Sequence, residues 1–327
     1  MKPYLSQIAF SVSAMERTIR FYRGVFGLED GGGVTAFRGH GAEYVQGIPG
    51  IKSKTHWMQD GRPPIQLEFF EFEYPPPLPI PDTWRPCDIG ITRVAFEVAD
   101  IMDVLNKARR LGATNIRGPL MIGNIPHAVF RDPDGICIHV MEVGGGLGGR
   151  PSRIAGVANS VSDLDAHAKM YEHGFSLPVV PCDLSPMDAL LGLDGAERRS
   201  VRIAGEYAWI ELSEYACPRP VPRRENHRLT DIGLSHIAFS TSGMKGFDHL
   251  FRDLVQHGWF RPNRLRPLKV GPFAGLMYGR DMEYFTIELM YMSPLFHGMF
   301  GFRRPGRVDR AAQNVMSKFM EMIYGTA

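Results

Sequence analysis

His236 and Arg93 carry the clearest chemical information in the chain, because they occupy equivalent positions of a long repeat. The segment Asp88–Phe96 returns 143 residues later as Asp231–Phe239, and self-similarity over such a distance indicates a duplicated structural unit. An imidazole can bind a metal ion or transfer a proton, whereas a guanidinium stays protonated. The exchange indicates that chemistry was kept in one copy and lost in the other.

Two glutamates show that the register extends beyond this segment. Glu68, in Leu67–Glu71, falls on Glu211, in Ile210–Glu214, at the same offset of 143 residues. The proline-rich stretch before each copy recurs as well, so the register holds across a linker. Carboxylates and imidazoles are groups that bind divalent cations and transfer protons.

Each half contains a weaker internal repeat, so the sequence predicts four similar units. Every unit starts with an alternating strand and continues into a helix that ends at a glycine, the expected C-terminal stop. The predicted strand and helix pairs are Gln7–Val12 with Glu16–Phe26, Arg93–Val98 with Ile101–Leu111, Gly156–Val161 with Leu164–Glu172, and His236–Thr241 with Phe247–Gln256. The strands that close the units are predicted at Ile65–Phe72, Ile136–Met141, Ala208–Ser213 and Phe285–Met290.

The order of elements in each unit is strand, helix and three strands. This order places the helices on one face of a sheet and leaves the other face free, which predicts an α+β fold of four βαβββ modules. We expect a first domain at 1–146, with modules 4–73 and 91–143, and a second at 150–292, with modules 153–214 and 233–292. Residues 293–327 are predicted to form a C-terminal tail with an amphipathic helix over Val308–Tyr324.

The composition favours a globular protein that binds small molecules. The chain has 327 residues, 44% of them hydrophobic, and a formal net charge of +2, which gives no long-range field for nucleic acid or anionic lipid. We find no signal peptide and no apolar run that could span a membrane, and we expect a cytoplasmic protein. The four cysteines lack any CxxC spacing, which indicates reduced thiols rather than a thiolate zinc site.

The repeated first strands are accompanied by two further motifs, a turn and a closing-strand pattern. The turn Arg131–Gly135 returns 149 residues later as Arg280–Tyr284; the first is a good turn sequence and the second a degraded one. Together with the Ile-Glu-Leu pattern of the closing strand, the sequence over residues 4 to 292 resembles the vicinal-oxygen-chelate superfamily. That superfamily contains glyoxalase I, methylmalonyl-CoA epimerase, extradiol ring-cleaving dioxygenases and bleomycin-resistance binding proteins. The resemblance implies paired modules that form two cupped half-barrels, with metal ligands on the first and last strands.

Carried over by this resemblance, the ligand positions fall on two residues in each module. They are Gln7 and Glu68, Arg93 and His139, Gly156 and Glu211, and His236 and Glu288. Only the first and fourth modules offer a possible ligand at both positions, and the resulting set resembles the Gln, Glu, His, Glu arrangement of glyoxalase I. Because an unpaired carboxylate on a concave face is costly, two of them require a cation. One imidazole with three oxygen donors suits Zn, Ni, Fe(II), Mn or Co.

The lengths of the links between modules bear on which modules pair. The link at 144–150 is short, whereas the links at 74–88 and 215–231 are long and rich in proline. Short links favour neighbouring modules, so we expect modules two and three to pair, and therefore one and four. Arg93 would then pair with Glu211 or Glu97 and fill a second, inactive site. A pairing of three with four, with a site of Glu211, His236 and Glu288, is the alternative.

Tyr278 lies ten residues before Glu288, in a segment that resembles the extradiol dioxygenase signature. The signature's proline and glycine are Met282 and Tyr284 here, and its upstream histidine is missing. Ring cleavage normally uses two histidines and one carboxylate, and Gln7 stands where the second histidine would be. The resemblance therefore makes Tyr278 a candidate catalytic residue, and a core aromatic is the alternative.

Taken together, the sequence predicts a metal-dependent, glyoxalase-like lyase or isomerase acting on a small, partly apolar substrate with vicinal oxygens. Glu68 or Glu288 is the expected base. An Fe(II) extradiol-type dioxygenase of catechols or hydroquinones is the first alternative, and a metal-free small-molecule binding protein is the second. The Met- and aromatic-rich segment 294–302 either shapes an apolar pocket or provides packing or a homodimer contact.

Overall fold

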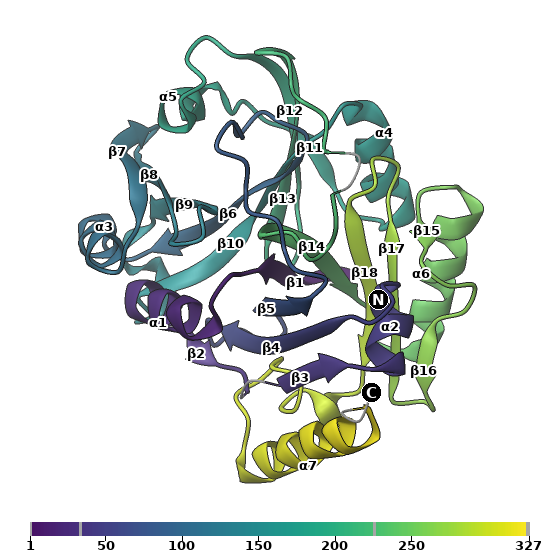
Figure 1. Ribbon diagram of the computed structural model, residues 1–327. Helices are drawn as coiled ribbons and strands as arrows, with labels where there is room; N and C mark the ends of the chain where they lie inside the picture. Colours follow the sequence, from purple (N-terminus) through teal and green to yellow (C-terminus); the bar gives the residue numbers. More distant parts are fainter. Residues whose placement is uncertain (1, 33–34, 225–226, 325–327) are drawn as a thin grey trace.

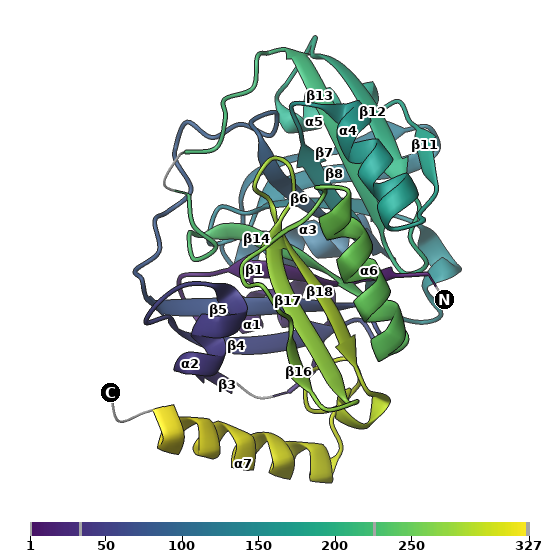
Figure 2. The same ribbon diagram turned by 90° about the vertical axis from the view of Figure 1, so that its right-hand side faces the viewer.

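The computed structural model describes residues 2–32, 35–224 and 227–324, with the side chains of residues 35 and 316–324 outside the description. Two mixed β-sheets lie side by side, and helices cover their outer faces and the junction between them (Figures 1 and 2). The predicted α+β fold of four βαβββ modules in two cupped half-barrels with a helical tail is confirmed.

Among the described residues, ten strands form the first sheet. Its main order is β15-β17-β18-β14-β1-β5-β4-β2, with β16 beside β17 and β3 beside β4. The strands are β1 (Tyr4–Ser11), β2 (Glu29–Asp30), β3 (Thr35–Arg38), β4 (Lys52–Gln59), β5 (Gln66–Tyr74), β14 (Gly233–Ser240), β15 (Arg261–Pro262), β16 (Leu268–Val270), β17 (Ala274–Arg280) and β18 (Thr286–Met292). This sheet therefore combines the first module of the chain with the fourth.

The second sheet combines the two middle modules, in the order β11-β12-β13-β10-β6-β9-β8-β7. Its strands are β6 (Gly90–Val98), β7 (Thr114–Ile122), β8 (Ile125–Arg131), β9 (Cys137–Glu142), β10 (Ser152–Ser160), β11 (Val179–Pro181), β12 (Glu197–Ile203) and β13 (Trp209–Cys217). The expected pairing of module one with four and of two with three is confirmed, and the alternative pairing of three with four is not found. The domain limits at residues 146 and 150 stay a prediction, since each sheet takes one module from each half.

The helices follow the opening strands as predicted. They are α1 (Met15–Phe26), α2 (His40–Gln46), α3 (Ile101–Arg110), α4 (Leu164–Lys169), α5 (Asp188–Leu191), α6 (Met244–Gln256) and α7 (Arg307–Tyr324), with short turns η1 (Gly144–Leu147), η2 (Met170–Gly174), η3 (Ser185–Met187) and η4 (Pro294–Phe296). The third module's helix is shorter than expected, because η2 continues it as a π-helical turn. Gly27 ends α1 with a φ of 66° and donates its N–H to Arg23 O, which is the expected glycine stop.

Helices from different modules contact each other at the junction of the two sheets. α1 contacts α3, and α6 contacts η2 (Figures 1 and 2). Phe26 from α1 stacks on Phe96 from β6, with ring centroids 3.9 Å apart, and Phe175 lies 4.2 Å from Phe239 of β14. One buried apolar core therefore runs across both sheets.

The repeated aspartates of the two proline-rich linkers hold the linkers together. Asp88 Oδ1 accepts the Val221 N–H at 2.9 Å, and Asp231 Oδ1 accepts the Leu78 N–H at 3.1 Å. Each aspartate thus binds the linker of the opposite half. Both carboxylates are buried. A buried acceptor needs a hydrogen-bond donor, and a backbone N–H supplies it here.

The two predicted turns, Arg131–Gly135 and Arg280–Tyr284, have the same hydrogen-bonding pattern despite their different sequences. Asp132 Oδ1 accepts the N–H groups of Asp134 and Ile136, and Asp281 Oδ1 accepts the corresponding N–H groups two and four residues later in its own turn. Gly135 has a φ of 84°, and Tyr284 takes its place with a φ of 64°. The aspartate, which both copies share, is therefore what defines the loop.

A candidate metal centre at one end of an apolar cavity

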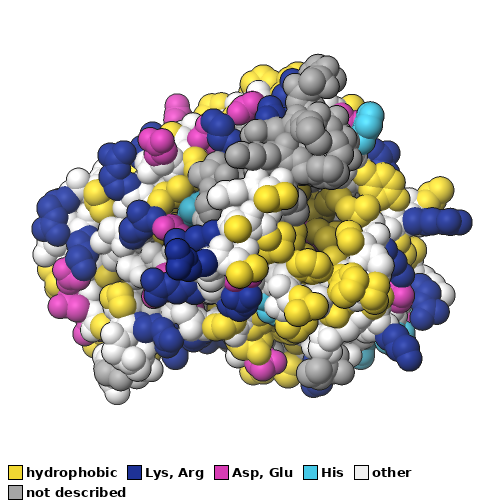
Figure 3. All heavy atoms as spheres, turned by 90° about the horizontal axis from the view of Figure 1, so that it is seen from below, with side chains coloured by type: hydrophobic (Ala, Val, Ile, Leu, Met, Phe, Trp, Pro, Cys, Tyr) yellow, Lys and Arg dark blue, Asp and Glu magenta, His cyan; other side chains and the backbone are white. Residues whose placement is uncertain are grey.

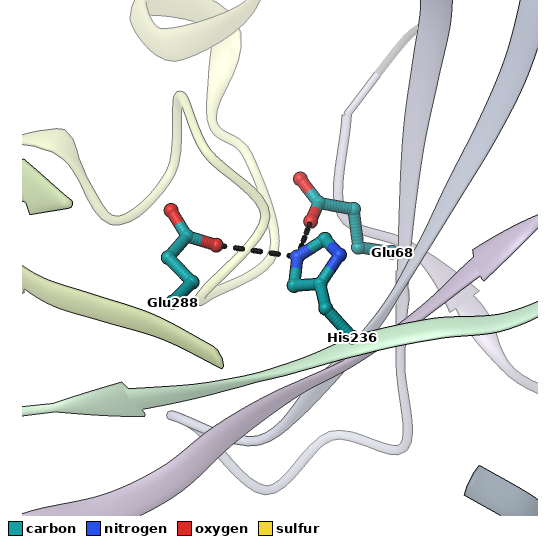
Figure 4. Close-up of side chains that lie close together, drawn as sticks. All are labelled: Glu68, His236 and Glu288. Atoms are coloured by element: carbon teal, nitrogen blue, oxygen red, sulfur yellow. Dashed lines mark ion pairs between the residues drawn. The ribbon is translucent and has the colours of Figure 1, made fainter. Parts of the chain in front are cut away.

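Glu68, His236 and Glu288 come together at the centre of the first sheet, each from a different strand (Figure 4). One ligand atom of each side chain lies within 4.8 Å of the others, and all three residues are buried. His236 Nε2 is 3.5 Å from Glu68 Oε2 and 3.4 Å from Glu288 Oε2. Three of the four residues predicted as ligands thus form one cluster.

The strand register explains why these side chains meet. Ala9 on β1 pairs with Glu68 on β5 and with His236 on β14. One step along the sheet, Ala238 on β14 pairs with Gln7 and with Glu288 on β18. Each row across the sheet therefore has an alanine between two larger polar residues. Because residues two apart share a face of a strand, both rows point into the same cup.

Gln7, the fourth predicted ligand, lines the cavity together with Glu68 and Glu288. Its Oε1 atom is buried and has no hydrogen-bond partner among the described residues, and the same holds for Glu68 Oε2. Buried polar atoms are nearly always satisfied in native proteins. Two unsatisfied acceptors at one end of a cavity are therefore a sign of a ligand that supplies positive charge or hydrogen-bond donors.

Tyr278 lies beside this cluster rather than in the distant core. Its hydroxyl is 3.1 Å from His236 Nε2, and it stands opposite Glu288 in the pairing of β17 with β18. Burial raises the pKa of Tyr278 well above its usual value, and the charges of Glu288 and Glu68 raise it further. The phenol is therefore protonated and can donate a hydrogen bond.

Two residues of the site were missed by the sequence analysis, Trp57 and Gln46. Trp57 Nε1 donates a hydrogen bond to Glu68 Oε1 at 2.9 Å, from the position opposite Glu68 in the pairing of β4 with β5. Gln46, at the end of α2, lines the cavity, and its Oε1 is buried without a partner among the described residues. Cross-strand pairing on the face of Glu68 is the signal that could have identified Trp57. Gln46 has no comparable signal, because α2 lies outside the repeat.

The charges of the site fit a divalent cation. Burial lowers the pKa of His236, but the polar contacts of its imidazole with Glu288 at 3.4 Å and Glu68 at 3.5 Å, together with their charges, outweigh it and raise the pKa to about 9. Burial raises the pKa of Glu288, and the Glu68 charge adds to this. A single imidazolium beside two carboxylates leaves one negative charge in a buried site, which is costly. A divalent ion with a neutral imidazole balances both carboxylates, so the donor set fits such a metal.

The cluster closes one end of a cavity of about 330 Å³. The remaining walls are largely apolar and come from β3, α2, β16–β18 and the segment after β18. They include Phe37, Val45, Leu276, Met292, Phe296 and Phe300. Figure 3, which views the molecule from the side of α7, shows a hollow bordered by hydrophobic side chains. The Met- and aromatic-rich segment 294–302 thus contributes to the wall of the cavity. This agrees with the first of the two roles expected for it, shaping an apolar pocket.

The equivalent place in the second sheet is occupied by an ion pair. The Arg93 guanidinium donates to Glu211 Oε2, and Arg202 donates to Glu211 Oε1 at 2.6 Å. His139 Nε2 lies 2.8 Å from His127 Nδ1 instead of facing a carboxylate. The prediction that Arg93 pairs with Glu211 is confirmed, whereas Glu97 pairs with another residue, Arg153. That the pair fills a second, inactive site stays a prediction.

Comparisons with known proteins agree with this fold. Residues 4–140 match the sequence profile of the Glyoxalase/Bleomycin resistance protein/Dioxygenase superfamily. No curated protein matches the chain in sequence. Among the described residues, no helix has both the length and the hydrophobicity needed to cross a bilayer.

Two solved structures illustrate the similarity. Glyoxalase I from Zea mays is 16% identical, with a TM-score of 0.62 over 88% of this chain and 92% of the maize chain. A putative dioxygenase from Bacillus subtilis is 15% identical, with a TM-score of 0.62 over 97% of this chain and 95% of the other. At such identities the likeness concerns the fold. The chain therefore shares the fold of these structures over most of its length, and its residues 4–140 carry the sequence profile of the Glyoxalase/Bleomycin resistance protein/Dioxygenase superfamily.

Proposed function

We propose that the protein is a metal-dependent lyase or isomerase, which binds one divalent ion through Gln7, Glu68, His236 and Glu288. Its substrate is a small, partly apolar molecule with two adjacent oxygens. The observation that carries the proposal is the buried cluster of two carboxylates and one imidazole, in which Glu68 Oε2 and Gln7 Oε1 have no hydrogen-bond partner among the described residues.

The side chains of the site have distinct roles in this proposal. A bound divalent ion would supply Lewis-acid polarisation of two adjacent substrate oxygens. Glu68 Oε2 is available to remove a proton from the carbon next to the polarised carbonyl, because Trp57 holds only the other oxygen. Glu288 is the second candidate base. The Tyr278 hydroxyl donates a hydrogen bond toward the substrate oxygen on which negative charge develops.

The donor set favours this chemistry over ring cleavage. Non-haem Fe(II) oxygenases commonly use two histidines and one carboxylate. The described residues of this cluster offer one imidazole, from His236, with two carboxylates. A dioxygenase remains the alternative that oxygen consumption would reveal, and a metal-free binding protein is the alternative that metal analysis would reveal.

Elemental analysis of the purified protein, followed by reloading of chelator-treated protein with Zn, Ni, Mn, Co or Fe(II), tests the metal site. We expect about one ion per chain for the wild type. His236→Gln and Glu68→Gln should lose most of it, whereas Glu71→Gln, a partly exposed carboxylate on the same strand, should keep it. Full metal content in His236→Gln would rule the site out.

Solvent exchange tests the reaction class. The metal-loaded protein should incorporate deuterium from D₂O at the carbon next to the carbonyl of an α-hydroxyketone, as followed by NMR. Glu68→Gln and Glu288→Gln, each assayed at a metal concentration that restores full occupancy, then identify the base, since only the variant of the base should lose exchange while it still holds metal and substrate. Oxygen uptake with catechol or hydroquinone, without any exchange, would instead favour the dioxygenase.

A further inference from the structure

The polar atoms of the cavity are gathered at one end. Among the described lining residues, the polar side chains other than the Trp57 indole are Gln7, Gln46, Glu68, Tyr278 and Glu288. Tyr278, Glu68 and Glu288 contact His236 directly. Gln46 follows Val45, which packs with Tyr278 in one cluster, and Gln7 on β1 lies one row from His236. A ligand in this cavity thus meets hydrogen-bonding groups at one end only.

Within the part of the chain that the structure describes, the other walls offer no group that could pair with a negative charge. They consist of aliphatic, aromatic and methionine side chains, and no lysine, arginine or histidine occurs among the described lining residues. An anionic group in such surroundings loses its hydration without gaining a partner, and it also lies near Glu68 and Glu288. The cavity therefore disfavours carboxylates and phosphates on its ligand.

The apolar surface continues outward from the cavity. Val270, at the end of β16, lines the cavity and is 54% exposed. Phe273 is 42% exposed, and its ring packs edge-on against Phe296 of the cavity wall, with centroids 5.9 Å apart. The neighbouring basic residue Lys269 is already engaged, since it pairs with Asp248 at 2.6 Å. The entrance is thus apolar as well as the interior.

We propose that the substrate is an uncharged, mainly hydrocarbon molecule whose oxygen atoms all lie at one end, and that it carries no carboxylate, phosphate or peptide arm. The location of the oxygens rests on the proposed function, while the exclusion of charge rests on the cavity walls alone. The unpaired Oε1 of Gln46 accepts a hydrogen bond from a substrate hydroxyl, which favours a hydroxyketone or diol over a diketone.

A matched pair of probes tests this substrate class, para-methyl-α-hydroxyacetophenone and its para-carboxylate analogue. The two share the ring and the vicinal oxygens and differ only in charge at the far end. Calorimetric titration of the metal-loaded protein should show the methyl compound binding at least about thirtyfold more tightly, because the carboxylate has no partner in the walls. Equal affinity for the two probes would overturn the proposal.

Two arginine substitutions test whether the preference for the methyl probe arises at the cavity wall. Val270→Arg places a cation at the cavity wall, at an exposed position that tolerates it, and should reduce the preference for the methyl probe at least about threefold by strengthening carboxylate binding. Val180→Arg is the matched control, because Val180 is 52% exposed and lies on β11 of the other sheet. An unchanged preference in Val270→Arg, or an equal change in Val180→Arg, would show that the probes bind elsewhere.

The metal content of each preparation separates this proposal from the previous one. If the protein binds no metal, the proposed enzymatic function fails, but the preference between the two probes still reports on the walls. If metal binds and the preference is absent, only the substrate class fails.

Discussion

Trp57 donates its indole N–H to Glu68 Oε1 over 2.9 Å, and this bond decides which oxygen of the carboxylate faces the cavity. Glu68 Oε1 is thereby satisfied, and Oε2 is left 3.5 Å from His236 Nε2 with no other partner among the described residues. Trp57 also packs edge-on against Phe300, with centroids 6.0 Å apart. The same indole therefore joins the carboxylate to the wall formed by the C-terminal segment.

Replacing this indole should weaken metal binding. Trp57→Phe keeps an aromatic ring but removes the hydrogen bond that orients Glu68, and loss of such an outer partner typically costs about ten- to hundredfold in metal affinity. Competition with a chromophoric chelator measures the change. Trp259→Phe is the control, because this partly buried indole packs against the apolar core and is not among the described lining residues of the cavity. Equal affinities for the two variants would contradict the orienting role of Trp57.

The ion pair of the second sheet should behave as a structural element only. Arg93→Met leaves the buried Glu211 carboxylate with Arg202 as its remaining partner, and we expect the free energy of unfolding to fall by about 3 kcal/mol. Adding Glu211→Leu should restore most of the loss, because no unpaired charge then remains. Urea titration measures the stability of each variant. Metal content should be unchanged throughout, and a loss of metal in Arg93→Met would show that the second sheet contributes to the site.

His139 should make stability depend on pH. Burial lowers its pKa well below the usual value, and the charges of Arg93, His127 and Arg202 lower it further, while Glu211 is the nearby acid of this cluster. Because the unfolded chain then binds a proton that the folded chain does not, stability falls as the pH drops below about 6.5.

The slope attributable to this one group approaches about 1.4 kcal/mol per pH unit. Urea titrations between pH 5 and 8 should therefore show a smaller loss on acidification for His139→Gln than for the wild type. His173→Gln, at a well-exposed imidazole, should follow the wild type. Parallel curves for all three proteins would show that His139 does not contribute.

The linker aspartates should stabilise the fold without affecting the metal site. Asp231→Ala leaves the Leu78 N–H unpaired and removes the only described link from that carboxylate to the opposite linker, and we expect a loss of about 2 kcal/mol. Asp82→Ala, at an exposed position of the same linker as Leu78, should change stability little. Thermal unfolding measures both, and similar melting temperatures would contradict the clamping role.

The strands and their pairing could be predicted from the sequence where a residue type recurs at a fixed spacing. The offset between Glu68 and Glu211 and the exchange of Arg93 for His236 located the strands that meet in each cup. The short link at 144–150 then indicated the correct pairing of modules, because a short chain cannot cross to a distant strand. These features are local or periodic, so they are visible without coordinates.

The middle strands of each module and the residues around the site could not be predicted from the repeat. Trp57 lies on β4 and Gln46 on α2, where the repeat is too weak to align the modules. Tyr284 adopts the positive φ that Gly135 adopts in the other copy, so the loop survived a substitution that made it look degraded. Hydrogen bonds from the Glu283 and Phe285 N–H groups to the Asp281 carboxylate hold this turn without the glycine, and the residue types alone did not show that these two bonds would suffice.

The strand order places β1 between β5 and β14, so the first sheet joins an early module of the sequence with the last of its four modules. A nascent chain released before Thr286–Met292 has β14 without its parallel neighbour and Glu68 without its counterpart acid. Ribosome-bound intermediates must therefore keep an open strand edge until β18 has been made, whereas the second sheet can close earlier. Truncation before β18 would consequently affect the sheet with the candidate metal centre first.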